Sequence, residues 1–200
     1  MTIMFHKGNR QLQDQFDSRR IADRLEEKLT RQAFTEGDRS FIEALPFFFL
    51  ATSDDRGRAD CSFKGGLPGF VRVTGASELA FPDYDGNGMF KSLGNILVNP
   101  EVGLLFIDMG DKPRRLRVNG RATVLRDDPL MQKFAGAQLL VRVAVRAIFP
   151  NCPRYVTTPG VAEPSKYAPR PGYEPPEPAW KGFDDFKDYV HPRQKTPDGA

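Results

Sequence analysis

The chain has 200 residues, 40% hydrophobic and 28% charged, a composition typical of one domain with a packed core and some extensions. Its 29 basic and 26 acidic side chains leave a formal net charge of +3, too small to favour nucleic acid or an anionic membrane as main partner. No apolar run approaches the roughly 18 residues of a membrane span, and residues 1–20 are polar and charged where a signal peptide is apolar. We therefore expect a cytoplasmic protein.

The chain has few of the residues that form metal sites and histidine-based catalytic triads. Its two cysteines, Cys61 and Cys152, are not in a metal-ligand spacing, and its two histidines, His6 and His191, lie near opposite ends. A thiol beside a redox cofactor can be reactive, but Cys152 has neither a cysteine nor a histidine next to it in sequence. The simplest interpretation of both cysteines is a small, buried apolar residue.

Residues 1–40 are predicted to form an N-terminal helical arm. Apolar side chains recur here mostly at four-residue steps among charged ones, which is the pattern of a helix with one apolar stripe that ends near Gly37. The stripe consists of Leu12, Phe16, Ile21, Leu25, Leu29 and Ala33.

Residues 41–150 have the pattern of an antiparallel sheet, with short strands joined by tight turns. In the last strand, the apolar side chains of one face alternate with Arg142 and Arg146, and Asp128 and Pro129 before it are typical of the cap and first turn of a short helix. Six or more antiparallel strands favour a barrel that closes its own edges. The expected strands cover residues 47–52, 59–64, 70–74, 79–81, 102–107, 116–125 and 139–149.

Residues 151–200 are predicted to form a proline-rich C-terminal extension. Most of the 17 prolines lie from Pro150 onward, and proline lacks a backbone donor, so this part cannot be sheet interior. Its aromatic side chains indicate that it packs on the barrel or on a dimer partner, since a mobile linker, the alternative, seldom carries so many rings. These rings belong to Tyr155, Tyr167, Tyr173, Trp180, Phe183, Phe186 and Tyr189.

Two segments of the predicted barrel carry most of the polar side chains that could bind a ligand. In the first, Ser62 and Lys64 place a hydroxyl and an ammonium group beside two adjacent glycines, Gly65 and Gly66. Glycine permits close approach of the backbone to a ligand. The alternative is a hairpin connection that needs glycine only for a positive φ, and the spacing leaves both interpretations open.

The second segment covers residues 81–100. A strand ends at Phe81, a turn-rich loop follows, and residues 89–98 have the apolar spacing of a short helix. The free amides and dipole at a helix N-terminus suit an anion, and Lys91 and Asn95, four residues apart, project from one face of that helix. The alternative is a decorated surface helix, because the segment contains neither glycine-rich nucleotide signature.

A series of motifs follows in order along residues 41–155. They are Asp60-Cys61-Ser62-Phe63-Lys64-Gly65-Gly66, Pro68-Gly69-Phe70-Val71, Pro82-Asp83, Gly86-Asn87, Asn95-Ile96, Asn99-Pro100, Leu104-Leu105-Phe106, Leu116 to Ala122 and Phe149 to Tyr155. Together they resemble the predicted flavin-nucleotide-binding proteins related to pyridoxamine 5′-phosphate oxidase. The resemblance implies the FMN-binding split barrel of that family, mainly β with flanking helices, and is much less specific for the reaction.

The resemblance also implies that FMN binds to this chain. In similar proteins, basic side chains on the strand before the loop and on the helix after it commonly hold the FMN phosphate, and Arg72 and Lys91 occupy these positions here. Ser62 and Lys64 would reach the ring or the ribityl chain from a neighbouring strand. The other implied cofactor contacts are Asp83, Tyr84 and Asn87 in the loop, Asn95 on the helix, and Arg115 and Arg117 on the strand opposite.

This sequence departs from the family at two of these positions. Tyr84 stands where relatives often carry arginine, which removes a phosphate donor, and Phe63 stands where they often carry proline. No group of residues that would bind the phosphate of pyridoxine phosphate is evident, so we do not expect a pyridoxamine phosphate oxidase.

The activity that the resemblance implies is that of a homodimeric FMN-dependent oxidoreductase with its cofactors at the dimer interface. The flavin would take a hydride from a small-molecule substrate or a nicotinamide donor and pass electrons to a second substrate, which fits a chain poor in histidine. The alternatives are a non-catalytic flavin- or haem-binding protein for storage or sensing, and an electron carrier that uses deazaflavin. A haem ligand would have to come from His6 or His191.

Overall fold

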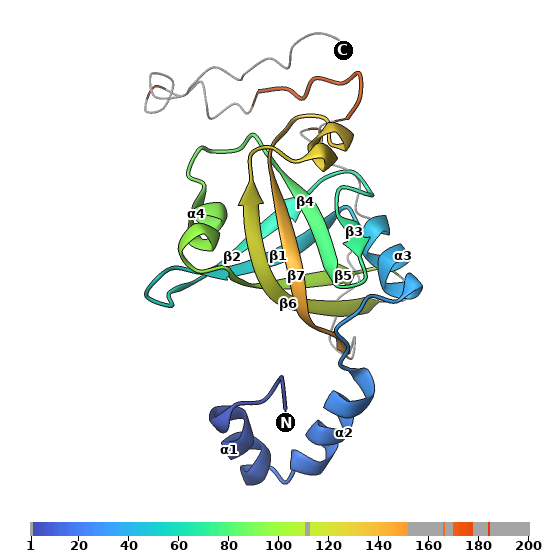
Figure 1. Cartoon of the computed structure of the whole chain (residues 1–200), viewed down its shortest axis with the longest axis vertical. Helices are drawn as coiled ribbons and strands as arrows, with labels where there is room; N and C mark the ends of the chain where they lie inside the picture. Colours follow the sequence, from blue (N-terminus) through green and yellow to red (C-terminus); the bar gives the residue numbers. More distant parts are fainter. Residues whose placement is uncertain (1, 111–112, 152–165, 167–169, 178–183, 185–200) are drawn as a thin grey trace.

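The computed structural model describes residues 2–110, 113–151, 166, 170–177 and 184. Its centre is one seven-stranded antiparallel sheet that curls into a barrel, with the strand order β2-β1-β5-β6-β7-β4-β3 (Figure 1). In chain order the elements are α1 (Lys7–Gln15), α2 (Arg19–Leu29), α3 (Glu36–Ala44), β1 (Phe47–Ser53), β2 (Ala59–Gly65), β3 (Arg72–Gly75), β4 (Glu78–Tyr84), α4 (Lys91–Val98), β5 (Glu101–Asp108), β6 (Arg114–Leu125), the 3₁₀ helix η1 (Pro129–Lys133) and β7 (Ala137–Asn151).

The predicted fold class, mainly β and antiparallel with flanking helices, is confirmed. Each of the seven predicted strands is present with its bounds shifted by a few residues. The expectation that the barrel closes its own edges is wrong, because β2 and β3 end the strand order and do not pair with each other within the described residues. The barrel is therefore split between these two edge strands.

The hydrophobic core lies inside the curled sheet and is centred on Phe48. The centroid of its ring lies 5.0 Å from that of Phe81 and 5.2 Å from that of Phe106, and 5.9 Å from that of Phe70. Phe48 is inaccessible to solvent because β1 alternates, with its even-numbered side chains pointing inward. Other fully buried residues of this core are Ile42, Leu50, Leu79, Leu104, Val118, Val141 and Ile148.

A bulge interrupts the long pairing between β6 and β7. The register passes from Asn119 opposite Ala147 to Gly120 opposite Val145. A side chain at Gly120 would collide with the carbonyl oxygen of Ala144, so only glycine fits. Beyond the bulge the inward positions of β7 change, and for this reason the face predicted for the last strand does not continue to its end.

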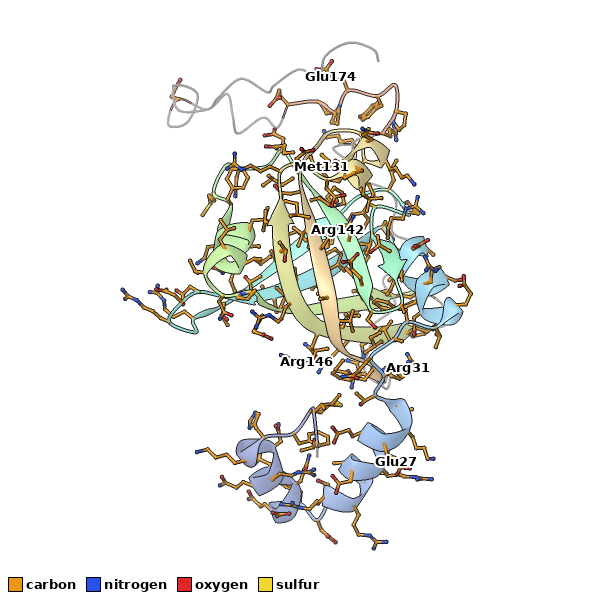
Figure 2. All side chains as sticks on the ribbon, in the orientation of Figure 1. Glu27, Arg31, Met131, Arg142, Arg146 and Glu174 are labelled. Atoms are coloured by element: carbon orange, nitrogen blue, oxygen red, sulfur yellow. The ribbon has the colours of Figure 1, made fainter. Side chains whose placement is uncertain are left out.

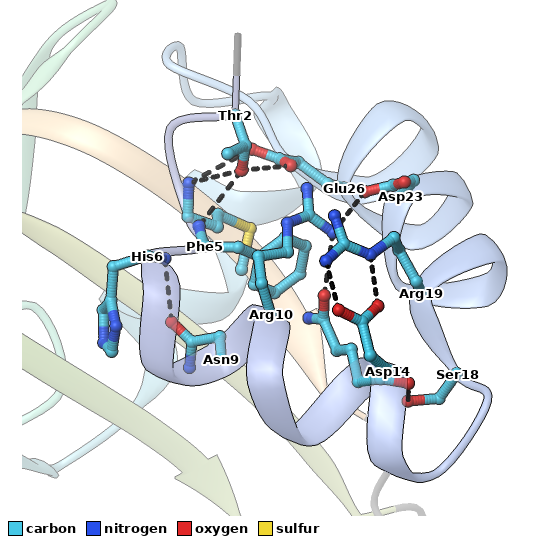
Figure 3. A network of polar contacts seen from close by, with 12 residues as sticks. Thr2, Phe5, His6, Asn9, Arg10, Asp14, Ser18, Arg19, Asp23 and Glu26 are labelled. Carbon is cyan, nitrogen blue, oxygen red and sulfur yellow. Dashed lines mark hydrogen bonds and ion pairs between the residues drawn. The ribbon is translucent and has the colours of Figure 1, made fainter.

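The predicted helical arm consists of two helices instead of one. The chain turns between α1 and α2, where Asp17 adopts a positive φ of 49°. Polar contacts join the two helices away from the turn: Arg10 of α1 lies 2.6 Å from Asp23 of α2, and the hydroxyl of Thr2, before α1, donates to Glu26 of α2 at 2.6 Å (Figure 3). A second ion pair, between Arg19 and Asp14 at 2.5 Å, connects them at the turn.

The apolar stripe predicted for this arm is exposed. Leu29 is 37% exposed and Phe16 is 73% exposed, and the two helices stand away from the barrel (Figure 1). Arg31 attaches the arm through the backbone: its N–H donates to the carbonyl of Ile148 at 2.9 Å, and the N–H of Ile148 donates back at 2.7 Å. The arm is thus joined to the C-terminal half of β7, and its helices α1 and α2 contain no buried residue.

Helix α3 and the 3₁₀ helix η1 flank the barrel. The sequence prediction missed α3, which contains Gly37 and begins at the N-cap Thr35, whose hydroxyl accepts from the Asp38 N–H at 3.1 Å. The predicted cap before the last strand is confirmed, since Asp128 accepts from the N–H of Leu130 at 2.9 Å at the start of η1.

The described part of the C-terminal extension makes local contacts. The Tyr173 hydroxyl donates to the carbonyl of Lys166 at 2.8 Å, and the Arg170 guanidinium lies 3.9 Å from the centre of the Tyr173 ring. Cys152, His191 and the other predicted anchoring rings lie outside the described residues. Among the helices that the structure describes, none is long and apolar enough to cross a membrane.

Candidate functional site

Residues 62–64 of β2 lie close to two segments that are far from them in the sequence. The hydroxyl oxygens of Ser62 on β2 and Ser92 in the first turn of α4 are 2.8 Å apart and share a hydrogen bond. Lys64, next along the same face of β2, is close enough to the end of β4 for its charge to act on Asp83. We refer to Ser62, Lys64, Asp83, Lys91 and Ser92 as the β2–α4 cluster.

The N-terminus of α4 offers uncapped amide groups. Its N-cap residue, Phe90, adopts a left-handed conformation with φ 47° and ψ 28°, and among the described residues no side-chain hydrogen bond caps this end. Lys91, the first helical residue, is exposed. Free N–H groups and the positive end of the helix dipole favour an anion, so this end of α4 is suited to bind one.

The opposite side of α4 is held on β1 by amide side chains. Asn95 is only 5% exposed, and its amide nitrogen donates to the Thr52 hydroxyl at 3.0 Å. Asn99 donates in the same way to the hydroxyl of Ser53 at 2.9 Å. Asn95 therefore positions the helix, and it does not share the exposed face of Lys91 as the four-residue spacing predicted.

The end of β4 carries two partly buried ionisable groups. Burial raises the pKa of the Asp83 carboxyl, the positive charge of Lys64 lowers it, and the negative charge of Asp85 raises it further, with a net increase. Burial also raises the pKa of the Tyr84 hydroxyl to about 12. At neutral pH the Tyr84 hydroxyl is therefore protonated and can donate a hydrogen bond.

The raised pKa of Asp83 predicts that Asp83→Asn increases the free energy of unfolding at pH 7. Because the folded state holds the proton more tightly, the protonated carboxyl favours folding below its ordinary pKa of 3.8, and this advantage is lost as the pH rises through the folded-state pKa. The variant cannot ionise and avoids that loss. Urea unfolding should show a higher free energy of unfolding than the wild type at pH 7 and no difference at about pH 3.

The exposed Asp127→Asn variant is the matched control, and we expect it to unfold like the wild type at both pH values. An equal effect of Asp83→Asn at pH 7 and near about pH 3 would show that lost packing, and not ionisation, is responsible.

Arg72 lies away from the β2–α4 cluster. Its guanidinium is exposed at the start of β3 and lies 3.5 Å from the carboxylate of Glu43 on α3. β3 and α3 are on the side of the barrel opposite α4 (Figure 1). The structure therefore does not bring Arg72 and Lys91 together within one chain.

The remaining predicted site residues also have other surroundings. Arg115 and Arg117 both point away from the core on β6, as their alternation with buried neighbours predicted. The Arg117 guanidinium lies 6.0 Å from the centre of the Phe149 ring, and Arg115 lines a cavity beside α3. Asn87 is exposed, and its side-chain oxygen accepts from the N–H of Met89 at 3.0 Å, so it shapes the loop before α4.

The adjacent glycines near Ser62 make room for aromatic rings. A Cβ at Gly66 would lie 2.6 Å from Cγ of Phe70, and one at Gly65 would lie 2.7 Å from Cε1 of Phe63. Neither glycine has a positive φ, so the alternative that the hairpin needs glycine for its conformation is wrong. Packing of the two rings explains these glycines.

The sequence-based prediction did not identify two residues that position the cluster, Ser92 and Thr52. Both are buried polar residues that hold α4 against the sheet. The available signal was a pair of polar side chains, Ser92 and Asn95, three residues apart on the otherwise apolar face of a short helix.

A family model described as pyridoxamine 5′-phosphate oxidase matches residues 34–156. This range is more than half of the 200 residues and contains all seven strands of the sheet. The chain belongs to the pyridoxamine 5′-phosphate oxidase family. The match confirms the family resemblance that the sequence motifs indicated, together with the split-barrel fold of this family.

Several solved structures are similar to this family member. HupZ of Group A Streptococcus has 16% identity, covers 64% of this chain and 99% of its own, and gives a TM-score of 0.47. An FMN-binding protein from Syntrophomonas wolfei has 12% identity, and the match covers 70% of this chain and 97% of that protein, with a TM-score of 0.46. HutZ of Vibrio cholerae, a haem storage protein, has 17% identity, and the match covers 55% of this chain and 89% of HutZ, with a TM-score of 0.42. No curated protein matches the chain.

Proposed function

We propose that this chain is an FMN-dependent oxidoreductase of the pyridoxamine 5′-phosphate oxidase family. The observation that carries the proposal is the β2–α4 cluster, where the uncapped N-terminus of α4 and Lys91 lie beside a pair of serine hydroxyls. The FMN phosphate is an anion that needs charge-assisted donors, and its ring and ribityl chain need further polar contacts. The donor groups of the cluster fit these requirements.

Each part of the cluster has a separate role in this proposal. Lys91 and the first-turn amides of α4 would bind the phosphate, because they combine positive charge with aligned N–H donors. Lys64 and the Ser62–Ser92 pair would donate to oxygen atoms of the ribityl chain or ring. The bound flavin would supply the hydride transfer between a small-molecule or nicotinamide donor and a second substrate.

Asp83 and Tyr84 would control protons and charge next to these donors. The partly buried carboxyl of Asp83 feels the positive charge of the Lys64 ammonium, which lowers its pKa against the effect of burial. The Tyr84 hydroxyl stays protonated below about pH 12 and so remains a donor throughout the neutral range. These two residues shape the polar side of the site and do not themselves transfer electrons.

The absorption spectrum of the purified protein, followed by anaerobic titration with NADH or NADPH, tests the proposal. We expect a flavin spectrum that bleaches on titration, and saturation with FMN at a hundredfold excess over its Kd should raise stability by about 3 kcal/mol. A Soret-type band would favour haem instead. A colourless protein that FMN does not stabilise against heat would refute flavin binding, and a bound flavin that no hydride donor reduces would refute the oxidoreductase.

We also propose that the protein is a homodimer, with the outer face of β1 and β2 as part of its interface. On this face the ring of Phe63 stacks on that of Phe47 at 5.3 Å and meets Phe49 edge-on at 6.0 Å, yet Phe63 remains 61% exposed. Contiguous exposed apolar surface of this kind marks an interaction site. Further exposed apolar side chains lie on α4 and the loop before it, at Met89, Phe90, Leu97 and Val98.

Replacing Phe63 with glutamate should convert the dimer into a monomer. A charge at the centre of an apolar interface loses its hydration without gaining a partner, whereas Phe63→Tyr keeps the ring and should leave the dimer intact. Light scattering with size-exclusion chromatography measures the mass of both variants. A Phe63→Glu variant that is still dimeric would exclude this face from the interface.

A further inference from the structure

A cavity of about 410 Å³ opens where the helical arm joins the barrel. Its walls come from Arg31 after α2, the first turns of α3, the start of β6 and the end of β7. Figure 2 shows Arg31 at this junction, between the arm and the barrel. The cavity is remote from α4 and therefore separate from the β2–α4 cluster (Figure 1).

The lining of this cavity is rich in hydrogen-bond donors. It includes the guanidinium groups of Arg31, Arg114 and Arg115, and the carboxylate of Asp38. Asp38 is already occupied by the fold: its two oxygens accept from Nη2 of Arg31 at 2.9 Å each, and one also accepts from the N–H of Thr35 at 2.9 Å. The Asp38 carboxylate therefore does not pair with Arg114.

Arg114 is held in place by an aromatic ring. Its guanidinium carbon lies 4.4 Å from the centre of the Phe41 ring, an arrangement that fixes the guanidinium through cation–π attraction. A guanidinium stacked in this way keeps its in-plane N–H groups available for an oxyanion. Arg114 forms no ion pair with an acid in the part of the chain that the structure describes.

Buried polar atoms of Arg31 and Asn151, both in the cavity lining, have no hydrogen-bond partner within the described structure. They are Nε of Arg31 and Oδ1 of Asn151. Native proteins rarely leave such atoms unsatisfied unless water, an ion or a ligand completes them. The two ends of an amide are exchanged by a rotation of its plane, so Asn151 can present its NH₂ group to an anion in the same space.

We propose that this cavity binds the phosphate group of a small phosphorylated compound. Arg114 and the Nε of Arg31 provide donors on two sides. The three arginines and one aspartate of the lining leave a formal charge of 3 − 1 = +2, which a dianionic phosphate matches better than a single carboxylate does. The cavity is larger than a phosphate, and apolar surface from Phe41 and Leu116 remains for the organic part of the ligand. The assignment does not depend on the proposed FMN site.

Calorimetric titration of the full-length protein with glycerol 2-phosphate tests this assignment. The protein is first saturated with FMN, so that any flavin phosphate site is filled. We expect one binding site per chain in the wild type and at least tenfold weaker binding in Arg114→Gln. The matched control is Arg126→Gln, which removes an exposed arginine just beyond the other end of β6 and should bind like the wild type.

Three outcomes would overturn the assignment: no saturable binding to the wild type, equal weakening in Arg114→Gln and Arg126→Gln, or tighter binding of succinate than of glycerol 2-phosphate. Inorganic phosphate should compete for the same site. If Arg114→Gln does not fold, Arg114→Lys keeps the charge, removes the planar fork and should still weaken binding. If the protein does not retain FMN, the same Arg114-dependent site is expected without it, which separates this result from the proposed function.

Discussion

The Lys64→Gln/Lys91→Gln double variant should bind FMN at least a hundredfold more weakly than the wild type. Each substitution removes a charge-assisted contact from the β2–α4 cluster, and such a contact contributes about 1.5–3 kcal/mol. Two of them amount to about 3–6 kcal/mol, with about 1.4 kcal/mol for each factor of ten in affinity. Quenching of flavin fluorescence during titration with apoprotein measures the dissociation constant.

A matched double variant, Lys7→Gln/Lys28→Gln, removes the same charge from the exposed helical arm and should leave FMN affinity unchanged. Arg72→Gln tests the sequence-based expectation that Arg72 helps to bind the phosphate. The structure instead pairs this residue with Glu43. Full retention of FMN by the Lys64 and Lys91 double variant would remove both lysines from the cofactor site.

The second large effect concerns stability, and we expect Phe48→Ala to lower the free energy of unfolding by about 3–5 kcal/mol. Phe48 is fully buried, and its ring contacts three other phenylalanine rings that come from different parts of the chain. Removing the ring leaves a cavity that the surrounding strands cannot fill by small shifts. Urea unfolding followed by circular dichroism measures the loss.

Phe16→Ala is the appropriate control, because the same side chain is 73% exposed on the helical arm. This substitution should change the free energy of unfolding by less than about 0.5 kcal/mol. A similar loss in the two variants would mean that the arm buries Phe16 in solution.

The strands were predictable because buried and exposed side chains alternate within a single segment, as at the inward-facing Phe48 between the outward-facing Phe47 and Phe49. The end of the arm was not. Helix α3 depends on a cap formed by Thr35 and Asp38, and its apolar residues are so few that they appeared to begin the barrel. The turn at Asp17 requires a positive φ, which no periodic pattern reveals.

The candidate site shows the same limit more sharply. Ser62, Lys64 and Lys91 could be found because each lies in a short polar motif. The contact between Ser62 and Ser92 spans 30 residues, and that between Arg72 and Glu43 spans 29. Patterns within one segment say nothing about which distant segment it will meet. The pairing of Arg72 with Lys91 was implied by the family resemblance, and the fold of a single chain separates the two residues.

The two backbone hydrogen bonds between Arg31 and Ile148 have a consequence for solubility. Among the strands that the structure describes, the part of β7 beyond its pairing with β4 has a neighbour only on its β6 side, and unpaired strand edges allow other chains to add to them. Arg31 occupies this edge at Ile148, in the middle of the unprotected stretch. By pairing with Ile148, the arm covers part of a strand edge to which another chain could otherwise add.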